Sequence, residues 1–203
     1  MKIKNKLLFT FLLILVVLIP AAVVISINNG QTNDAIVRQY QIDQSAKTYE
    51  SGARDLQVGM DLYLRGKKEL GKQLIEVGTS QMATSREQLK ANAVGSSQLN
   101  SISETQVIEV KVLEVANEAI AISDGNATNR DALIAQRRAT LDARIEALNL
   151  RLSYFADRAS EDLAVTIQQS KQTTQQTLLV SFIAAFLICI GLALFMSDKL
   201  TKP

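Results

Sequence analysis

The chain has 203 residues, with 22 Lys and Arg against 20 Asp and Glu, no His, no Trp and one Cys. The lack of His excludes a serine hydrolase with a His base, a histidine autokinase site and a His-based metal site. The single Cys excludes a disulfide within the chain. Without a glycine-rich phosphate loop or paired carboxylates either, the sequence shows no sign of an enzyme, a cofactor site or a metal site.

The first apolar run covers residues 7–27, after a segment 1–6 that carries three lysines. Its 21 residues include no charge, and about 20 apolar residues are enough for a helix to cross a bilayer. A cleaved signal peptide is the alternative, but the apolar part of such a peptide usually spans about 7–15 residues. We therefore predict an uncleaved transmembrane helix over residues 7–27.

Residues 28–177 favour helices, because they are rich in Ala, Leu, Gln, Glu, Arg and Ser, contain no proline and show no strand-like alternation. Glycine and turn residues mark three breaks, at 64–68, 94–97 and 124–130. The predicted helices are therefore 28–65, 68–93, 97–123 and 131–177. A first break at Gly78 is the alternative, although it would leave the second helix too short to return beside the first.

The helix ends carry specific expectations. Gly95 is expected to stop the second helix, with a following serine, Ser96 or Ser97, as the next N-cap. Asp124 or Asn129 is expected to cap the fourth helix. These signals define helices joined by short loops, in which neighbouring helices are antiparallel.

Apolar residues on the first and fourth helices recur at alternating steps of three and four, which is the 3.5-residue period of helices packed in a bundle. The first seam is Ala46, Tyr49, Ala53, Leu56, Met60 and Tyr63, and the fourth is Leu141, Ile145, Leu148, Leu152, Phe155 and Ala159. The second helix offers Leu70, Leu74, Val77, Met82 and Leu89. The third offers Leu99, Ile102, Val110, Leu113 and Ile120 on one face, which Val107, Ile108, Val112 and Val115 broaden. We predict an all-α fold, an antiparallel up-down-up-down four-helix bundle flanked by two transmembrane helices.

The second apolar run, residues 178–196, is also uncharged and predicts the second transmembrane helix. Before it, polar residues at seam positions (Ser170, Thr174 and Thr177) weaken packing. This stretch is either simply solvated or a soft segment in which the fourth helix can slide.

Lysines flank the two runs on the sides of the chain termini, at positions 2, 4, 6, 199 and 202. This bias places both termini in the cytoplasm and residues 28–177 outside the inner (plasma) membrane. That outer segment holds 17 Lys and Arg against 19 Asp and Glu. The positive charge of the chain therefore indicates topology and not a nucleic-acid surface.

A basic N-terminus, a span, 150 helical residues, a second span and the closing segment 197–203 resemble the sensor and transmembrane region of bacterial and archaeal chemoreceptors (methyl-accepting chemotaxis proteins) and related HAMP-containing histidine kinases. Residues 62–66 also look like the end of the first sensor helix in these proteins. The resemblance implies that residues 197–203 begin a HAMP linker. It also implies a homodimer, a small-molecule ligand or binding protein outside, and an output domain or kinase complex in the cytoplasm.

On that reading, ligand binding shifts the fourth helix and the second span carries the displacement to the output domain, most often for chemotaxis. A longer chain that continues past Pro203 into HAMP and an output domain is expected if the sequence is a cut piece. A naturally short chain would instead favour the alternative, a membrane-tethered helical scaffold without a ligand. The sensor of a two-component kinase is a further alternative.

Arginines are the residues that we expect to bind a small anionic ligand, because the guanidinium group binds an oxyanion through two hydrogen bonds. On the fourth helix they recur every seven residues at 137, 144, 151 and 158. Such flanking arginines more commonly pair with neighbouring helices. If they bind ligand, we expect the distal Arg137, Arg138 and Arg144 to do so, with Tyr63 and Arg65 facing them from the end of the first helix.

Gly52, Gly59 and Gly66 also recur every seven residues, on the first helix. A glycine inside a helix costs about 0.8–1 kcal/mol relative to alanine, so a packing reason is needed. We expect this glycine edge to make room for the arginine edge of the fourth helix. A close crossing between two subunits is the alternative.

Overall fold

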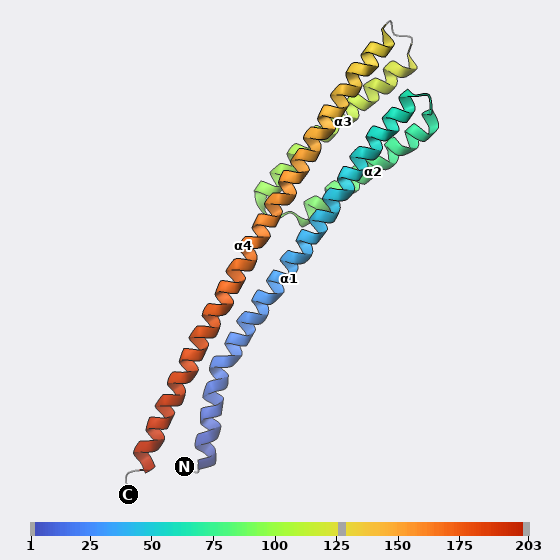
Figure 1. Cartoon of the computed structure of the whole chain (residues 1–203). Coiled ribbons are helices and arrows are strands. Elements are labelled where there is room, and N and C mark those ends of the chain that lie inside the picture. Colours follow the sequence, from blue (N-terminus) through green and yellow to red (C-terminus); the bar gives the residue numbers. More distant parts are fainter. Residues whose placement is uncertain (1–2, 126–128, 201–203) are drawn as a thin grey trace. The chain divides into compact units, whose positions relative to one another are not determined.

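The computed structural model describes residues 3–125 and 129–200 and is helical apart from short connections (Figure 1). The four α-helices are α1 (Ile3–Leu64), α2 (Lys68–Asn92), α3 (Gly95–Asp124) and α4 (Arg130–Leu200). The predicted all-α class and the three main breaks are confirmed. Gly78 lies inside α2, so the alternative first break is wrong. The last residues of the predicted HAMP segment, 201–203, lie outside the described residues.

The chain forms two compact units. The terminal unit comprises Met1–Ile36 with Leu163–Pro203, and the core unit comprises Val37–Asp162. Helices α1 and α4 each contribute residues to both units, whereas α2 and α3 belong to the core unit alone.

The terminal unit carries the two apolar runs, and most of their described side chains are exposed or half-buried. In each run, only 6% of the most apolar stretch is buried, and the mean hydropathy there is 2.8 in α1 and 2.7 in α4. Both helices are thus long and apolar enough to cross a membrane. The side chains of Val16 and Phe182 are 66% and 75% exposed. Apolar surface left uncovered on this scale is typical of a surface that contacts a membrane or another protein.

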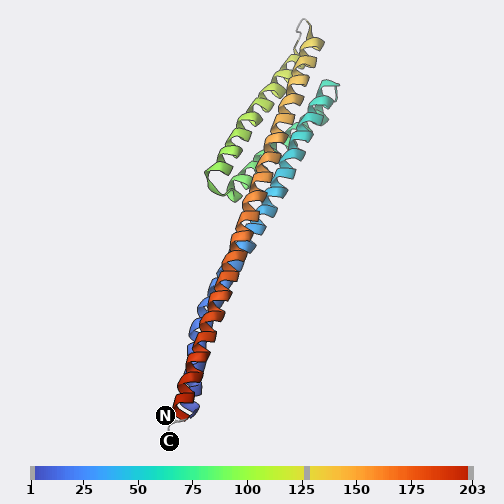
Figure 2. The ribbon, with the colours of Figure 1, turned by 60° about the vertical axis from the view of Figure 1, so that its left-hand side comes forward.

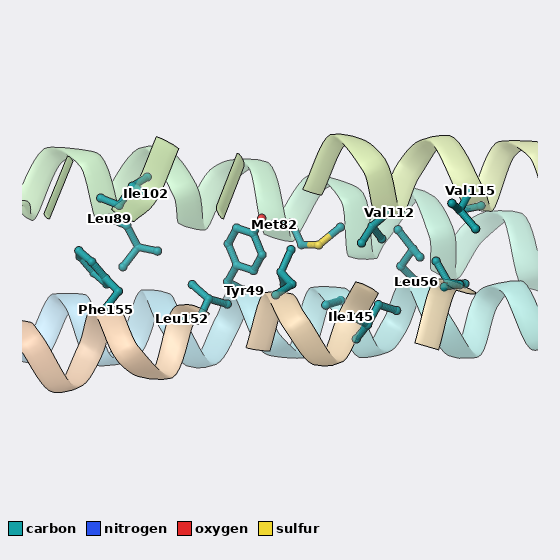
Figure 3. Close-up of a cluster of buried hydrophobic side chains, with 14 of the residues drawn as sticks. Tyr49, Leu56, Met82, Leu89, Ile102, Val112, Val115, Ile145, Leu152 and Phe155 are labelled. Atoms are coloured by element: carbon teal, nitrogen blue, oxygen red, sulfur yellow. The ribbon is translucent and has the colours of Figure 1, made fainter. Parts of the chain in front are cut away.

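The core unit buries one continuous cluster of apolar side chains from all four helices (Figure 3). Tyr49, Met82, Val112 and Leu152 point into the space between the helices in this view. Every residue of the predicted α1 seam and of the predicted α4 seam is buried, so both seams are confirmed. The 3.5-residue spacing of these seams brings one face of each helix to the same core.

The predicted apolar face of α2 is confirmed only in part. Met82 and Leu89 are buried as expected, but Leu70 and Val77 are about half exposed, at 49% and 47%. The buried positions one residue away are Gly71 and Gly78. The helix is therefore rotated so that glycine, and not leucine or valine, faces α1.

The cause of this rotation is a close approach of the backbones of α1 and α2. A Cβ atom added to Gly71 would lie 2.7 Å from the carbonyl oxygen of Gly59, and one added to Gly59 would lie 2.8 Å from that of Gly71. One heptad away, a Cβ atom on Gly52 would lie 2.7 Å from the carbonyl oxygen of Gly78. Real Cβ atoms do not approach so closely, so the crossing requires glycine on both helices.

This glycine crossing corrects the predicted partner of the glycine edge. Gly52 and Gly59 pack against α2 within the same chain, not against the arginine edge of α4. The two helices run side by side in both views of the ribbon (Figures 1 and 2). Gly66, the third member of the heptad series, instead ends α1. It has a φ of 86°, and its N–H donates to the carbonyl of Tyr63 while the N–H of Lys67 donates to that of Leu62.

The buried face of α3 also differs from the predicted one. Ile102 is buried and Leu113 and Ile120 pack against the core, but Leu99 and Val110 are 44% and 57% exposed. The actual face includes four polar residues at helical spacing, namely Gln98, Thr105, Glu109 and Ser123. Val112 and Val115, which broaden the predicted face, are buried as well. The prediction for α3 is thus confirmed in part, and apolar periodicity alone misses the polar residues of the buried face.

The predicted glycine stop, serine N-cap and Asp124 cap are wrong. Asn129, the other predicted cap of α4, directly precedes that helix, and its carbonyl oxygen accepts from the N–H of Leu133 at 3.1 Å. Gly95 is the first residue of α3, with a φ of 81°, and does not end α2. The N-cap of α3 is Val94, whose N–H donates to Oε1 of Gln98 at 2.8 Å. Asp124 belongs to α3 and its carboxylate binds Tyr63 and Lys68, so it does not cap α4.

Replacing Gly71 by Ala tests the glycine crossing. The added methyl group meets the backbone of Tyr63 at 2.6 Å and that of Gly59 at 2.7 Å. We expect the core unit to lose about 2 kcal/mol of unfolding free energy, since backbone cannot move aside as a side-chain end can. The measurement is guanidinium unfolding of the full chain followed by helical circular dichroism.

Gly30→Ala is the matched control, because nothing lies within 4 Å of a Cβ atom at this exposed helical position. It should leave stability unchanged or raise it by about 0.5–1 kcal/mol. Equal stability of the Gly71→Ala and Gly30→Ala chains would contradict the close crossing.

Candidate functional site

Tyr63, one of the predicted ligand residues, lies in a cluster of three side chains at the turn between α1 and α2. Its ring is buried, and its hydroxyl donates to Oδ2 of Asp124 at 2.7 Å. Nζ of Lys68 donates to Oδ1 of the same carboxylate at 2.7 Å and lies 5.6 Å from the centre of the Tyr63 ring. The hydroxyl of Tyr63 is thus already committed to a partner within the chain.

The electrostatics of this cluster follow from the shared carboxylate. Hydrogen bonds from Lys68 and then from Tyr63 hold the pKa of Asp124 below its ordinary value. The same carboxylate raises the pKa of Tyr63 and that of Lys68, in each case chiefly through the hydrogen bond. The cluster keeps Asp124 ionised and connects the tip of the α1–α2 turn to the end of α3.

Two of the predicted arginines are in ion pairs with neighbouring helices. Nε of Arg137 lies 3.1 Å from Oε2 of Glu118 on α3. An Nη atom of Arg138 donates to Oδ2 of Asp61 on α1 at 2.6 Å. Flanking arginines commonly form such ion pairs with neighbouring helices. A role of Arg137 and Arg138 in ligand binding stays a prediction.

The other two predicted arginines have no ion pair. Arg65 is exposed on the turn after α1, and its side chain has no hydrogen bond or ion pair with the described residues. Arg144 is half-buried on α4, and its Nε atom is buried without a hydrogen-bond partner. The structure therefore brings Arg138 to α1 and Arg137 to α3, but shows no direct contact that joins the five predicted residues into one site.

Sequence reasoning missed a buried polar network in the middle of the core unit. The hydroxyl of Tyr49 on α1 donates to Oε2 of Glu109 on α3 at 2.6 Å. Nη1 of Arg86 on α2 donates to Oε1 and Oε2 of the same carboxylate at 2.8 and 2.9 Å. Tyr49 is 0% and Glu109 is 3% exposed. One carboxylate thus connects three helices within the core.

Burial and this network shift two pKa values. Burial first, and the bond to Glu109 second, raise the pKa of Tyr49 well above its ordinary range. Burial alone would lower the pKa of Arg86, but its hydrogen bonds and charge interactions with Glu109 and Glu87 together outweigh that effect and raise it. The signal in the sequence is the position of Glu109, which continues the 3.5-residue series of Gln98 and Thr105 on α3.

A polar groove lies between α1 and α2. It has a volume of about 500 Å³ and is lined by hydroxyl, amide and ammonium side chains: Gln44, Lys47, Thr48, Ser80, Gln81, Thr84, Ser85 and Gln88. Oε1 of Gln81 and Oγ of Ser85 are buried there without a hydrogen-bond partner. Such a groove suits water or a small hydrophilic molecule.

Among residues 3–125 and 129–200, no group of three His, Cys, Asp or Glu side chains could hold a metal ion. Comparison with protein-family models, with curated proteins and with solved structures finds no match to this chain.

Replacing Glu109 by Ala should destabilise the core unit by about 3 kcal/mol, because Arg86 would keep a largely buried charge and Tyr49 a buried hydroxyl, both without their partner. Chemical unfolding of the full chain measures the loss. Glu87→Gln is the control, since Glu87 also pairs with Arg86 but its side chain is 62% exposed. That variant should change stability by less than about 0.5 kcal/mol. A loss no larger for Glu109→Ala than for Glu87→Gln would refute the role of the network.

Proposed function

We propose that this chain is the sensor and membrane segment of a transmembrane signal receptor. Residues 28–177 form the extracytoplasmic sensor, residues 7–27 and 178–196 cross the inner (plasma) membrane, and both termini are cytoplasmic. The observation that carries the proposal is the continuity of α1 and α4. Each runs without a break from an exposed apolar stretch in the terminal unit to a buried seam in the core unit. Such a helix connects a sensor mechanically to the other side of a membrane.

We infer that the core unit is an up-down-up-down bundle. Contacts between α1 and α2 pair Gly52 with Gly78 and Gly59 with Gly71, in opposite order along the two helices. Contacts between α3 and α4 pair residue 118 with 137 and residue 104 with 151, again in opposite order. Contacts between α1 and α4 pair residue 57 with 142 and residue 61 with 138, also in opposite order. Opposite order is typical of antiparallel helices, and short loops favour the same arrangement.

Helix α1 contacts α2 through its backbone but makes its polar contacts with α4 through side chains. This difference suits a signalling movement of α4. The crossing of α1 with α2 is made of backbone, which has one tight arrangement. The polar contacts of α1 with α4 are made by partly exposed side chains, as with Arg138 and Asp61, whose side chains are 46% and 30% exposed. Ion pairs of this kind contribute about 0–1 kcal/mol and exchange readily. A displacement of α4 against a fixed α1–α2 pair is therefore the movement with the lowest cost.

In the proposed mechanism, a ligand favours one of two positions of α4, and the second span carries the change to a HAMP linker and an output domain, most often in chemotaxis. The ligand can shift this equilibrium only by its difference in affinity for the two states. The polar seam before the second span suits such a shift. Ser170 there contacts α1 through one hydrogen bond of 3.3 Å to the carbonyl oxygen of Asn28.

The proposed partners are the lipid bilayer, a second copy of the chain, a small anionic molecule or a binding protein outside, and a kinase complex inside. A homodimer would cover apolar side chains that stay exposed on the core unit, such as Leu70, Val77, Val107 and Val110. No nucleic-acid partner is proposed.

Cysteine labelling tests the topology. In a Cys189→Ser background, a cysteine placed at exposed Ser96 should react with a membrane-impermeant maleimide in intact cells, because that residue lies in the outer segment. A cysteine at Lys2 should react only after the cells are permeabilised. Reaction of both positions under the same condition would place them on one side of the membrane and overturn the receptor proposal.

A chimera tests signalling separately from topology. Residues 1–203 are joined to the HAMP and kinase-control domains of a chemoreceptor with a known output, and kinase activity is measured against a panel of small anions, amino acids and periplasmic extracts. A receptor segment should change the activity with at least one of them. Constant activity throughout, with the labelling pattern intact, would favour the scaffold.

A further inference from the structure

Two ion pairs connect α3 and α4 in a regular ladder. Nε of Arg137 lies 3.1 Å from Oε2 of Glu118, and Nη1 of Arg151 lies 3.1 Å from Oε2 of Glu104. The two arginines are 14 residues apart on α4, and the two glutamates are 14 residues apart on α3 in the opposite direction. The pairs therefore belong to one antiparallel register.

The middle position of this ladder has a cation on both helices. One heptad from each pair, the register places Arg144 of α4 opposite Lys111 of α3. An acidic residue at position 111 would complete the ladder. The lysine instead leaves two positively charged residues at the same level of the ladder.

Neither cation is neutralised by the protein. Nε of Arg144 is buried and has no hydrogen-bond partner, and no ion pair of the described residues includes Arg144 or Lys111. On α4, the positions three and four residues from Arg144 hold Thr140, Leu141, Ala147 and Leu148, none of them acidic. On α3, Glu114 lies three residues from Lys111 but is exposed and forms no ion pair with it.

We propose that a small oxyanion binds between Arg144 of α4 and Lys111 of α3. A guanidinium group with a buried, unsatisfied N–H is a costly arrangement in a folded protein. An oxyanion that accepts from this N–H and from the exposed ammonium group of Lys111 removes that cost and the repulsion between the cations. The flanking Glu118 and Glu104 each lie 3.1 Å from their own arginine, which offsets their repulsion of the anion, although Oε2 of Glu118 accepts no hydrogen bond.

The shared chemistry of the ligand is a compact group of two or more anionic oxygens, as in sulfate, phosphate or a dicarboxylate. The binding site itself does not depend on the membrane topology. Its role as the sensed ligand rests on the proposed function. An anion bound there would join α3 to α4 and thereby favour one position of α4.

The experiment is thermal unfolding of the full chain in detergent micelles, followed by circular dichroism at constant ionic strength. Sodium chloride is replaced stepwise by sulfate, phosphate or malonate up to about 10 mM, where general salting effects are small. The melting temperature should rise by roughly 3–6 °C at saturation with a fitting anion. The three probes distinguish inorganic oxyanions from carboxylates.

Two substitutions at position 111 make the test specific. Lys111→Glu should raise the melting temperature without added anion, because it supplies the missing partner of Arg144, and should abolish the anion effect. Lys111→Gln should weaken the effect without adding a pair. Both changes are at an exposed position, so they leave the core intact.

Arg144→Gln should also abolish the shift, whereas the control Arg158→Gln should keep it, because Arg158 pairs with Glu161 of its own helix. The proposal is overturned if none of the three anions shifts the wild-type chain, or if the shift is the same in Arg144→Gln. A rise for Lys111→Glu with no anion effect in the wild type would show simple charge repulsion and would also overturn it. None of these results alters the cysteine-labelling pattern, so failure of the site and failure of the topology are separable.

Discussion

Where α1 and α2 cross, the carbonyl groups of each helix lie in the space that a side chain on the other would need. Gly52, Gly59, Gly71 and Gly78 make this approach sterically allowed. The crossing fixes the rotation of α2 about its own axis. From that rotation follow the burial of Met82 and Leu89 and the exposure of Leu70 and Val77. The remaining helices pack against a pair whose geometry has little freedom.

The other two helices are held by contacts of a different physical kind. Helix α3 joins α1 and α2 through the carboxylate of Glu109, which accepts bonds from both. Such a network is directional and specifies one register, because a shift would leave buried polar groups unsatisfied. Helix α4 contributes an apolar seam, which is less directional, together with partly exposed ion pairs. The core unit thus combines a rigid pair, a polar register and a more adaptable fourth helix.

The seams of α1 and α4 could be predicted from the sequence because apolar residues occupy nearly every buried position. The buried faces of α2 and α3 could be predicted only in part, because glycine replaces some apolar side chains on α2 and polar residues replace some on α3. The buried residues of both helices keep the same 3.5-residue spacing. Because some of them are glycine or polar, a search for apolar residues does not find them. An amphipathic pattern indicates a buried face only where burial depends on apolar side chains.

The candidate site shows a similar division. The choice of Tyr63, Arg137 and Arg138 followed from their chemistry and position, but their partners Asp124, Glu118 and Asp61 depend on the register between helices. A single sequence does not contain that register in readable form. Once the pairs at 137 and 151 are known, the charge conflict at Lys111 can be read directly from the heptad spacing.

The crossing of α1 and α2 also has a consequence for the order of folding. Its contacts join Gly59 to Gly71 and Gly52 to Gly78, which are close in the sequence and separated by a turn that Gly66 closes. Loop closure over so few residues has a low entropic cost, so this helical hairpin can form on a nascent chain before α3 has been synthesised. Backbone amides at the crossing should then be the first to resist deuterium in pulse-labelled refolding.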